Sequence, residues 1–213
     1  IKAILNRSVT QCERYRQMKE AGCSAEEIHD TFRKKIPMTV FTYHGDIDTL
    51  MSPLDSIRYY KTFLRSGFMS MDPKTGAVKA YVGGLDYTHF MYDMVSLGRR
   101  QVGSTIKPFL YSLAMENGFT PCDMAPNRQQ TYIVAGRRWT PRNANHSRYG
   151  QMVPLKWGLA QSNNWISAYL MSKLNPQQFV QLLRDYGINN PDIHASMSLC
   201  LGPCEVSVSE MVS

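Results

Sequence analysis

The chain has 213 residues, 43% of them hydrophobic, and a formal net charge of +7. This size allows one core of good size, or one domain with an extension. No apolar run approaches the roughly 20 residues that span a bilayer. The positive charge favours anionic surroundings, but the Lys and Arg residues are scattered. Nucleic acid is not an expected partner, because no zinc spacing, RNA-binding aromatic motif or basic helix is present.

The first third predicts two helices and a strand. Ser24–Glu27 is a capping box that opens a helix to about Lys34. The stretch 38–43 is rich in β-forming residues and predicts a strand. Ser52 followed by Pro53 is a helix start, and that helix is expected to run to about Ser66.

A β-hairpin is expected next, followed by an irregular aromatic stretch and further helices. The hairpin comprises strands 68–71 and 77–82, joined by the turn 72–76. A helix is predicted from about Ser104 to Met115, with Gly118 as its stop signal. Further on, the pattern predicts a strand at 130–135 and helices at 155–161, 165–174 and 177–186.

Both ends of the chain suggest a piece of a longer protein. The first residue is Ile1 rather than methionine, and no signal peptide opens the chain. Near the other end, the capping box Ser207–Glu210 predicts a helix just before the sequence stops. Because a helix of one turn is not worth forming, we expect the natural protein to continue.

Neither the cysteines nor the histidines suggest a metal or disulfide site. The five cysteines are odd in number and widely spaced, so buried or free thiols are expected. His44, His89 and His194 show no ligand spacing. No metal and no cofactor is therefore predicted.

The chemistry is carried by Ser104 and Lys107, a Ser-x-x-Lys pair at a predicted helix start. Positions i and i+3 of a helix share a face, so the amine can activate the hydroxyl as a nucleophile. The lysine must be neutral to act as a base, which requires a lowered pKa. Ser104 taken alone would more often be a helix cap, and it is the combination with the other motifs that favours a nucleophile.

A second motif follows at Ser162-Asn163-Asn164. Ser162 would relay a proton, and the Asn164 amide would hold the lysine and bind the substrate backbone.

This order of motifs resembles the penicillin-binding transpeptidases and the serine β-lactamases. The segments 72–84, 100–109, 139–143 and 158–164 are similar to those of class A penicillin-binding proteins. The resemblance implies an α+β fold, an antiparallel sheet with a helical subdomain, here incomplete. It implies that residues 1–51 are a linker following an absent glycosyltransferase domain. Residues 52–213 would then be the N-terminal part of a transpeptidase domain.

The resemblance also implies a function and a site. The activity would be D,D-transpeptidation of peptidoglycan, in which Ser104 forms an acyl-enzyme with D-Ala-D-Ala stem peptides and is also acylated by β-lactams. The catalytic residues would be Ser104, Lys107, Ser162 and Asn164. Asn163, Asn143 and Trp139 are predicted to contact the substrate. The partners would be stem peptides on lipid II-derived glycan strands, at the outer face of the cytoplasmic membrane, with the parent protein anchored there.

The third family motif, Lys-Thr-Gly, does not follow Asn164. Lys74-Thr75-Gly76 has these letters but precedes Ser104, so we interpret it as turn chemistry. The true motif is expected beyond Ser213. Two alternatives therefore remain: a D,D-carboxypeptidase or β-lactamase-type hydrolase, and a catalytically incomplete fragment that binds wall polymer or a partner.

Overall fold

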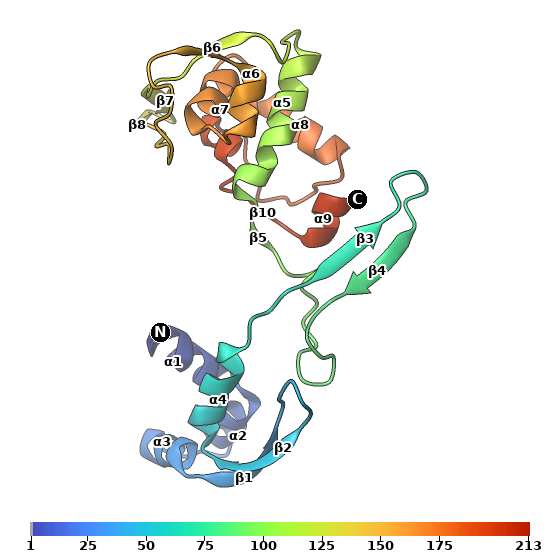
Figure 1. Ribbon diagram of the computed structural model, residues 1–213. Coiled ribbons are helices and arrows are strands. Elements are labelled where there is room, and N and C mark those ends of the chain that lie inside the picture. The colour runs from blue at the N-terminus through green and yellow to red at the C-terminus, as the bar shows by residue number, and fades with distance from the viewer. Residues whose placement is uncertain (1) are drawn as a thin grey trace. The chain divides into compact units, whose positions relative to one another are not determined.

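The computed structural model describes residues 2–213. The chain divides between Arg65 and Ser66 into two compact units, each with its own packing (Figure 1). Within the described residues, no helix is both long and apolar enough to cross a membrane.

The N-terminal unit consists of helices around one β-hairpin. Its elements are α1 (Lys2–Gln11), α2 (Glu13–Glu20), α3 (Ala25–Arg33), β1 (Ile36–Val40), β2 (Ile47–Met51) and α4 (Pro53–Thr62). The strands β1 and β2 pair antiparallel.

The predicted helix starts in this unit are confirmed. The Ser24 hydroxyl accepts a hydrogen bond from the Glu27 N–H at 3.2 Å, and the Glu27 carboxylate accepts one from the Ser24 N–H at 2.7 Å. The Ser52 hydroxyl caps α4 by accepting the Asp55 N–H at 3.1 Å. Sequence reasoning missed α1, α2 and β2, and it placed β1 too late, at 38–43 instead of 36–40.

Helix α4 belongs to the N-terminal unit. It contacts α1 and α3, and the Tyr59 hydroxyl donates to the Phe41 carbonyl at 2.7 Å. The division of the chain therefore follows α4 rather than preceding it. This differs from the expected boundary at 51/52, because a helix start identified from its cap carries no information about which neighbours the helix will pack against.

The C-terminal unit combines short antiparallel strand pairs with a helical bundle. Its elements are β3 (Phe68–Met71), β4 (Val78–Val82), β5 (Arg100–Gln101), the 3₁₀ helix η1 (Gly103–Ile106), α5 (Lys107–Glu116), β6 (Met124–Pro126), β7 (Tyr132–Val134), β8 (Arg137–Trp139), β9 (Met152–Pro154), α6 (Leu155–Ala160), α7 (Asn164–Met171), α8 (Pro176–Asp185), the 3₁₀ helix η2 (Met197–Leu201), β10 (Glu205–Val206) and α9 (Val208–Val212). The mixture of helices and antiparallel pairs confirms the predicted α+β class.

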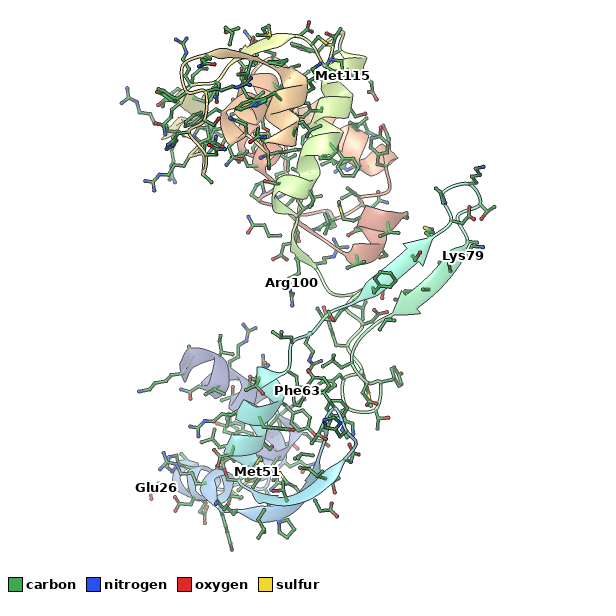
Figure 2. All side chains as sticks on the ribbon, in the orientation of Figure 1. Glu26, Met51, Phe63, Lys79, Arg100 and Met115 are labelled. Carbon is green, nitrogen blue, oxygen red and sulfur yellow. The ribbon has the colours of Figure 1, made fainter. Side chains whose placement is uncertain are left out.

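The β3–β4 hairpin forms as predicted, and helix α9 packs against β3 (Figures 1 and 2). In its turn, the Asp72 carboxylate accepts the backbone N–H groups of Lys74 and Thr75 at 2.9 and 3.0 Å. An aspartate that binds its own turn in this way is a common turn former. Lys74-Thr75-Gly76 thus serves the hairpin turn, as the sequence indicated.

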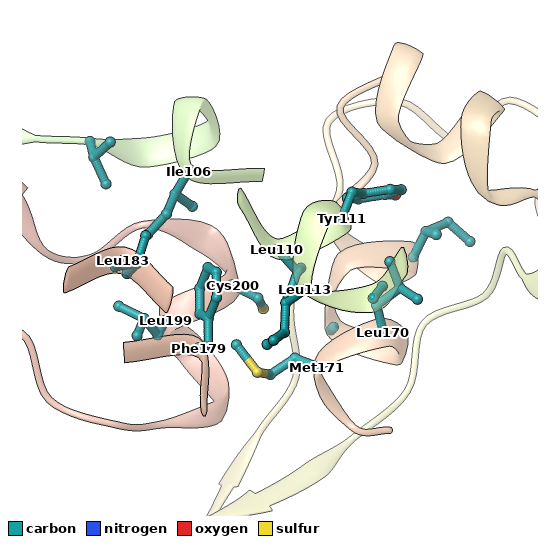
Figure 3. Packing of buried hydrophobic residues seen from close by; sticks show 14 of the residues in the cluster. Ile106, Leu110, Tyr111, Leu113, Leu170, Met171, Phe179, Leu183, Leu199 and Cys200 are labelled. Carbon is teal, nitrogen blue, oxygen red and sulfur yellow. The ribbon is translucent and has the colours of Figure 1, made fainter. Parts of the chain in front are cut away.

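Helix α5 lies at the centre of the bundle, with α7, α8 and η2 around it. Figure 3 shows Leu110 and Leu113 of α5 packed among side chains from these elements, including Leu170, Phe179 and Leu199. These five side chains are at most 4% exposed. Burial of such side chains contributes about 1.5–3 kcal/mol each, so α5 and the residues at its start are held by the best-packed part of the unit.

Candidate active site

The predicted Ser-x-x-Lys pair straddles a change of helix type. Ser104 lies in η1, a 3₁₀ turn, while Lys107 is the first residue of α5. Side chains three residues apart eclipse one another in a 3₁₀ helix. The Lys107 backbone N–H donates to the Ser104 carbonyl, so serine and lysine are one 3₁₀ turn apart. Ser104 is exposed, and among residues 2–213 its hydroxyl has no hydrogen-bond partner.

Lys107 is buried, with only 1% of its surface exposed. Its amine donates three hydrogen bonds: to the Ser162 carbonyl at 2.6 Å, to the Ser162 hydroxyl at 3.0 Å and to the Asn164 amide oxygen at 2.7 Å. The structure thus brings together Lys107, Ser162 and Asn164 from two distant segments, as the motif order indicated.

Burial shifts the pKa of Lys107. Loss of solvation disfavours the ammonium form and lowers the pKa of Lys107 from 10.5 to about 8. A charged Cys200 thiolate would act in the opposite direction. Burial raises the pKa of that thiol to about 12, so it is uncharged at neutral pH. All five cysteines carry free thiols, as predicted.

The backbone of Ser162 has a left-handed conformation and contacts Lys107 directly. Its φ of 48° is left-handed, a conformation that costs a non-glycine residue about 1 kcal/mol or more. Both Ser162 oxygens accept from the Lys107 amine. The sequence offered no signal for the carbonyl contact, because any residue type supplies the same backbone oxygen.

Asn164 is held from two sides. Its backbone N–H donates to the Asn143 side-chain oxygen at 3.0 Å, and its side-chain amide donates to the Arg142 carbonyl at 2.8 Å. Since the Asn164 oxygen faces Lys107, the loop at 139–145 orients this amide. Asn143 therefore touches the site through Asn164.

Asn163 lies differently from its prediction as a substrate contact. It is only 2% exposed, and its oxygen caps α7 by accepting the N–H groups of Trp165 and Ile166. Its amide donates to Asn127 at 2.9 Å. Its hydrogen-bonding groups are thus occupied inside the protein rather than directed to the surface, where a substrate contact was predicted.

Asn127 was missed by sequence reasoning. It is fully buried, and its amide donates to the carbonyls of Ser147 and Arg148 at 2.8 Å each. Through Asn163 it ties that loop to the start of α7. A single asparagine between Pro126 and Arg128 carries no motif, so only the fold reveals this link.

Trp139 ends β8, partly buried, and its ring lies against Tyr132 with centroids 6.0 Å apart. It belongs to the rim of the hydrophobic core.

Two backbone hydrogen bonds hold the segment that leads into Ser104. The N–H of Val102 donates to the Cys204 carbonyl at 2.9 Å, and that of Gly103 donates to the Gly202 carbonyl at 3.0 Å. A Cβ placed on Gly202 would stand 2.1 Å from the Gly103 carbonyl oxygen. Because no side chain tolerates that approach, the absence of a Cβ at this point sets how closely the two segments pack.

Comparison with known proteins agrees with this geometry. Residues 66–197 match the family model of the penicillin-binding protein transpeptidase domain, and residues 1–64 match that of the penicillin-binding protein middle domain. Ser104, Lys107, Ser162 and Asn164 all lie inside the first match.

Individual relatives give the same result. The chain is 34% identical over 147 residues to penicillin-binding protein 1A of Neisseria flavescens, and 29% identical over 149 residues to that of Pseudomonas aeruginosa. These alignments cover 68% and 69% of this chain but 18% of each relative, so the chain spans under a fifth of their length. The crystal structure of penicillin-binding protein 1A from Haemophilus influenzae superposes with a TM-score of 0.64 at 29% identity, covering 68% of this chain and 22% of that one. Because the transpeptidase model matches more than half of the residues, this chain belongs to the penicillin-binding protein transpeptidase family.

Proposed function

We propose that this chain carries the acylation site of a peptidoglycan D,D-transpeptidase, with Ser104 as nucleophile and Lys107 as its base. The observation that supports this most directly is the buried Lys107 amine, bonded to Ser162 and Asn164 one turn after Ser104. A lysine with a pKa near 8 is partly neutral at pH 7, so it can accept the serine proton.

The chemistry begins with a proton transfer. The neutral amine of Lys107 takes the Ser104 proton while the hydroxyl oxygen attacks the carbonyl of the scissile D-Ala-D-Ala bond. Ser162, 3.0 Å from the amine, takes this proton from the Lys107 ammonium and passes its own proton to the D-Ala nitrogen as the C–N bond breaks. The backbone N–H of Ser104, which has no acceptor within residues 2–213, supports the developing oxyanion.

An amine of a neighbouring stem peptide then attacks the acyl-enzyme and forms the new amide bond. The Ser104 ester bond breaks, and Lys107 moves the proton lost by the amine to the Ser104 oxygen. Asn164, oriented by Arg142 and Asn143, binds the backbone of the peptide. A β-lactam mimics the donor and leaves Ser104 acylated. The lifetime of this adduct distinguishes a transpeptidase from a hydrolase, because a β-lactamase or carboxypeptidase releases the acyl group to water and its adduct is short-lived.

The same proposal includes the domain organisation, partners and location of the whole protein. The middle-domain match over residues 1–64 supports a segment that links the transpeptidase to a preceding glycosyltransferase domain. The partners are stem peptides on lipid II-derived strands, at the outer face of the cytoplasmic membrane.

Intact-mass spectrometry after incubation with benzylpenicillin tests the proposal. We expect one adduct of the penicillin mass on the chain and none on Ser104→Ala. Ser209→Ala, a serine in α9 outside the lysine network, is the matched control and should acylate like the original chain. An adduct that persists in Ser104→Ala would assign the nucleophile elsewhere, and no adduct on either protein would refute acylation by these residues.

A further inference from the structure

Basic residues are spread along this chain, but acidic residues are not. Residues 124–184 contain eight Lys and Arg and no Asp or Glu. The rest of the chain has 16 Lys and Arg against 17 Asp and Glu, so this one segment accounts for the whole net charge of +7. The segment runs from β6 to the end of α8 and includes Ser162 and Asn164.

None of these charges is neutralised by the fold. Among residues 2–213, none of the eight forms an ion pair, and all are exposed. Figure 2 shows side chains tipped with nitrogen projecting outward around β7 and β8. The set is Arg128, Arg137, Arg138, Arg142, Arg148, Lys156, Lys173 and Arg184.

Two of these arginines are tied to the active site by their own backbone. The Arg142 carbonyl accepts the Asn164 amide at 2.8 Å. The Arg148 carbonyl accepts from Asn127, which also bonds to Asn163. The Arg148 guanidinium lies 5.5 Å from the centre of the Trp157 ring, on the helix that leads to Ser162. Two exposed arginines without an ion pair among residues 2–213 are therefore anchored through their backbones to the segment that carries Ser162 and Asn164.

We propose that Arg142 and Arg148 form a cationic rim that selects acyl donors carrying a carboxylate in addition to the one beside the scissile bond. The inference rests on the proposed acylation of Ser104 and adds the charge of the preferred substrate. The attachment of both arginines to the Ser162-Asn163-Asn164 segment favours a ligand of this site over a membrane surface, which would need no such attachment.

Coulomb's law gives the expected effect of the two arginines on the acylation rate of a donor with an additional carboxylate. Opposite charges about 10 Å apart in water attract enough to change an association rate by about twofold. Two arginines should therefore raise the association rate of such a donor about fourfold at low salt. At 0.15 M salt the screening length is about 8 Å, so the preference should shrink steadily as salt is added.

Two penicillins that differ by one carboxylate provide the test. Benzylpenicillin and carbenicillin, its analogue with a second carboxylate on the side chain, acylate the same serine, and the ratio of their second-order rate constants cancels general effects on Ser104. In the R142Q/R148Q variant this ratio of carbenicillin to benzylpenicillin should fall about fourfold at low salt. The matched control K173Q/R184Q removes two charges from the same acid-free segment, away from the motif, and should leave the ratio unchanged. On the original chain, 0.5 M salt should lower the ratio as the double variant does, which tests the rim without any mutation.

The outcomes separate the two proposals. If neither penicillin acylates Ser104, the proposed function fails and the rim with it. If both acylate but the ratio is the same in R142Q/R148Q, or falls equally in K173Q/R184Q, the rim is overturned while the function stands. Binding to vesicles of anionic phospholipid that is lost in R142Q/R148Q, with an unchanged ratio, would overturn it in favour of a membrane contact.

Discussion

The rate at which benzylpenicillin acylates Ser104 should follow the neutral fraction of Lys107. With a pKa of about 8, about a tenth of the lysine is neutral at pH 7 and about nine tenths at pH 9. At the ordinary pKa of 10.5, about 0.03% would be neutral at pH 7. We therefore expect the acylation rate constant to rise about tenfold between pH 7 and pH 9, with its midpoint near pH 8.

The contacts of Lys107 predict how a mutation moves this midpoint. Ser162 and Asn164 accept hydrogen bonds from the ammonium, which favours the charged form against the effect of burial. Removing the amide in Asn164→Leu takes away one such acceptor. A hydrogen bond to a charged group contributes about 1.5–3 kcal/mol, so the midpoint should fall by about one pH unit or more. Lys107→Arg keeps a cation that cannot deprotonate and should acylate slowly at every pH.

The assay is a time course of adduct formation by intact mass, from pH 6 to pH 10 at fixed ionic strength. Circular dichroism at each pH confirms that the chain stays folded. A rate constant that is flat from pH 6.5 to pH 9.5, or that rises equally in Lys107→Arg, would refute Lys107 as the base.

The same pKa shift predicts a stability readout. Because the folded-state pKa lies below the unfolded value, the unfolded chain binds a proton more readily between pH 8 and pH 10.5. Burial of Lys107 therefore lowers the free energy of unfolding fully below pH 8, and this cost disappears as pH rises through that window. The change should be about 1–3 kcal/mol and should be absent from Lys107→Met in urea titrations.

Three further substitutions test the site's architecture. Ser162→Gly should keep the free energy of unfolding or raise it by up to about 1 kcal/mol, because glycine adopts a positive φ freely, whereas Ser162→Ala keeps the strain. Both variants should be acylated at least tenfold more slowly than the original chain. Equal acylation of Ser162→Ala and the original chain would exclude Ser162 as the proton relay. Gly202→Ala should lower the free energy of unfolding by more than about 2 kcal/mol, because its Cβ would stand 2.1 Å from the Gly103 carbonyl oxygen. Thermal unfolding measures this change, and an unchanged stability would show that the backbone at Gly202 and Gly103 moves apart to accept the Cβ. Asn163→Asp should keep the cap of α7 but place a carboxylate oxygen against the Asn127 side-chain oxygen, which in the original chain accepts a hydrogen bond from the Asn163 amide. The free energy of unfolding should fall by about 1–3 kcal/mol. Asn163→Asp combined with Asn127→Ala should lower it by less than the sum of the two single changes.

Local features of the site were accessible from the sequence. Ser104, Lys107, Ser162 and Asn164 were identified because spacing on a helix and side-chain chemistry are local properties. The capping box at Ser24 was identified for the same reason, since its partners are three residues apart.

Features that depend on distant segments were not accessible. Asn163 was predicted to contact the substrate because its motif neighbours were predicted to be catalytic, yet its amide donates to Asn127, thirty-six positions away. The attachment of α4 to the N-terminal unit depends likewise on packing against α1 and α3, which no cap signal reveals.

The sequence by itself determined which groups can react: a serine and a lysine one turn apart, and a serine and an asparagine to complete them. Only the tertiary structure decided how they work. It buries Lys107 and so lowers its pKa to about 8, and it turns the Ser162 carbonyl toward the amine. It also brings the backbone of Arg142 against Asn164, whose amide donates to the Arg142 carbonyl. The physical reason is that reactivity of a side chain depends on its type, whereas desolvation and charge proximity depend on every segment that the fold brings within a few ångströms of it.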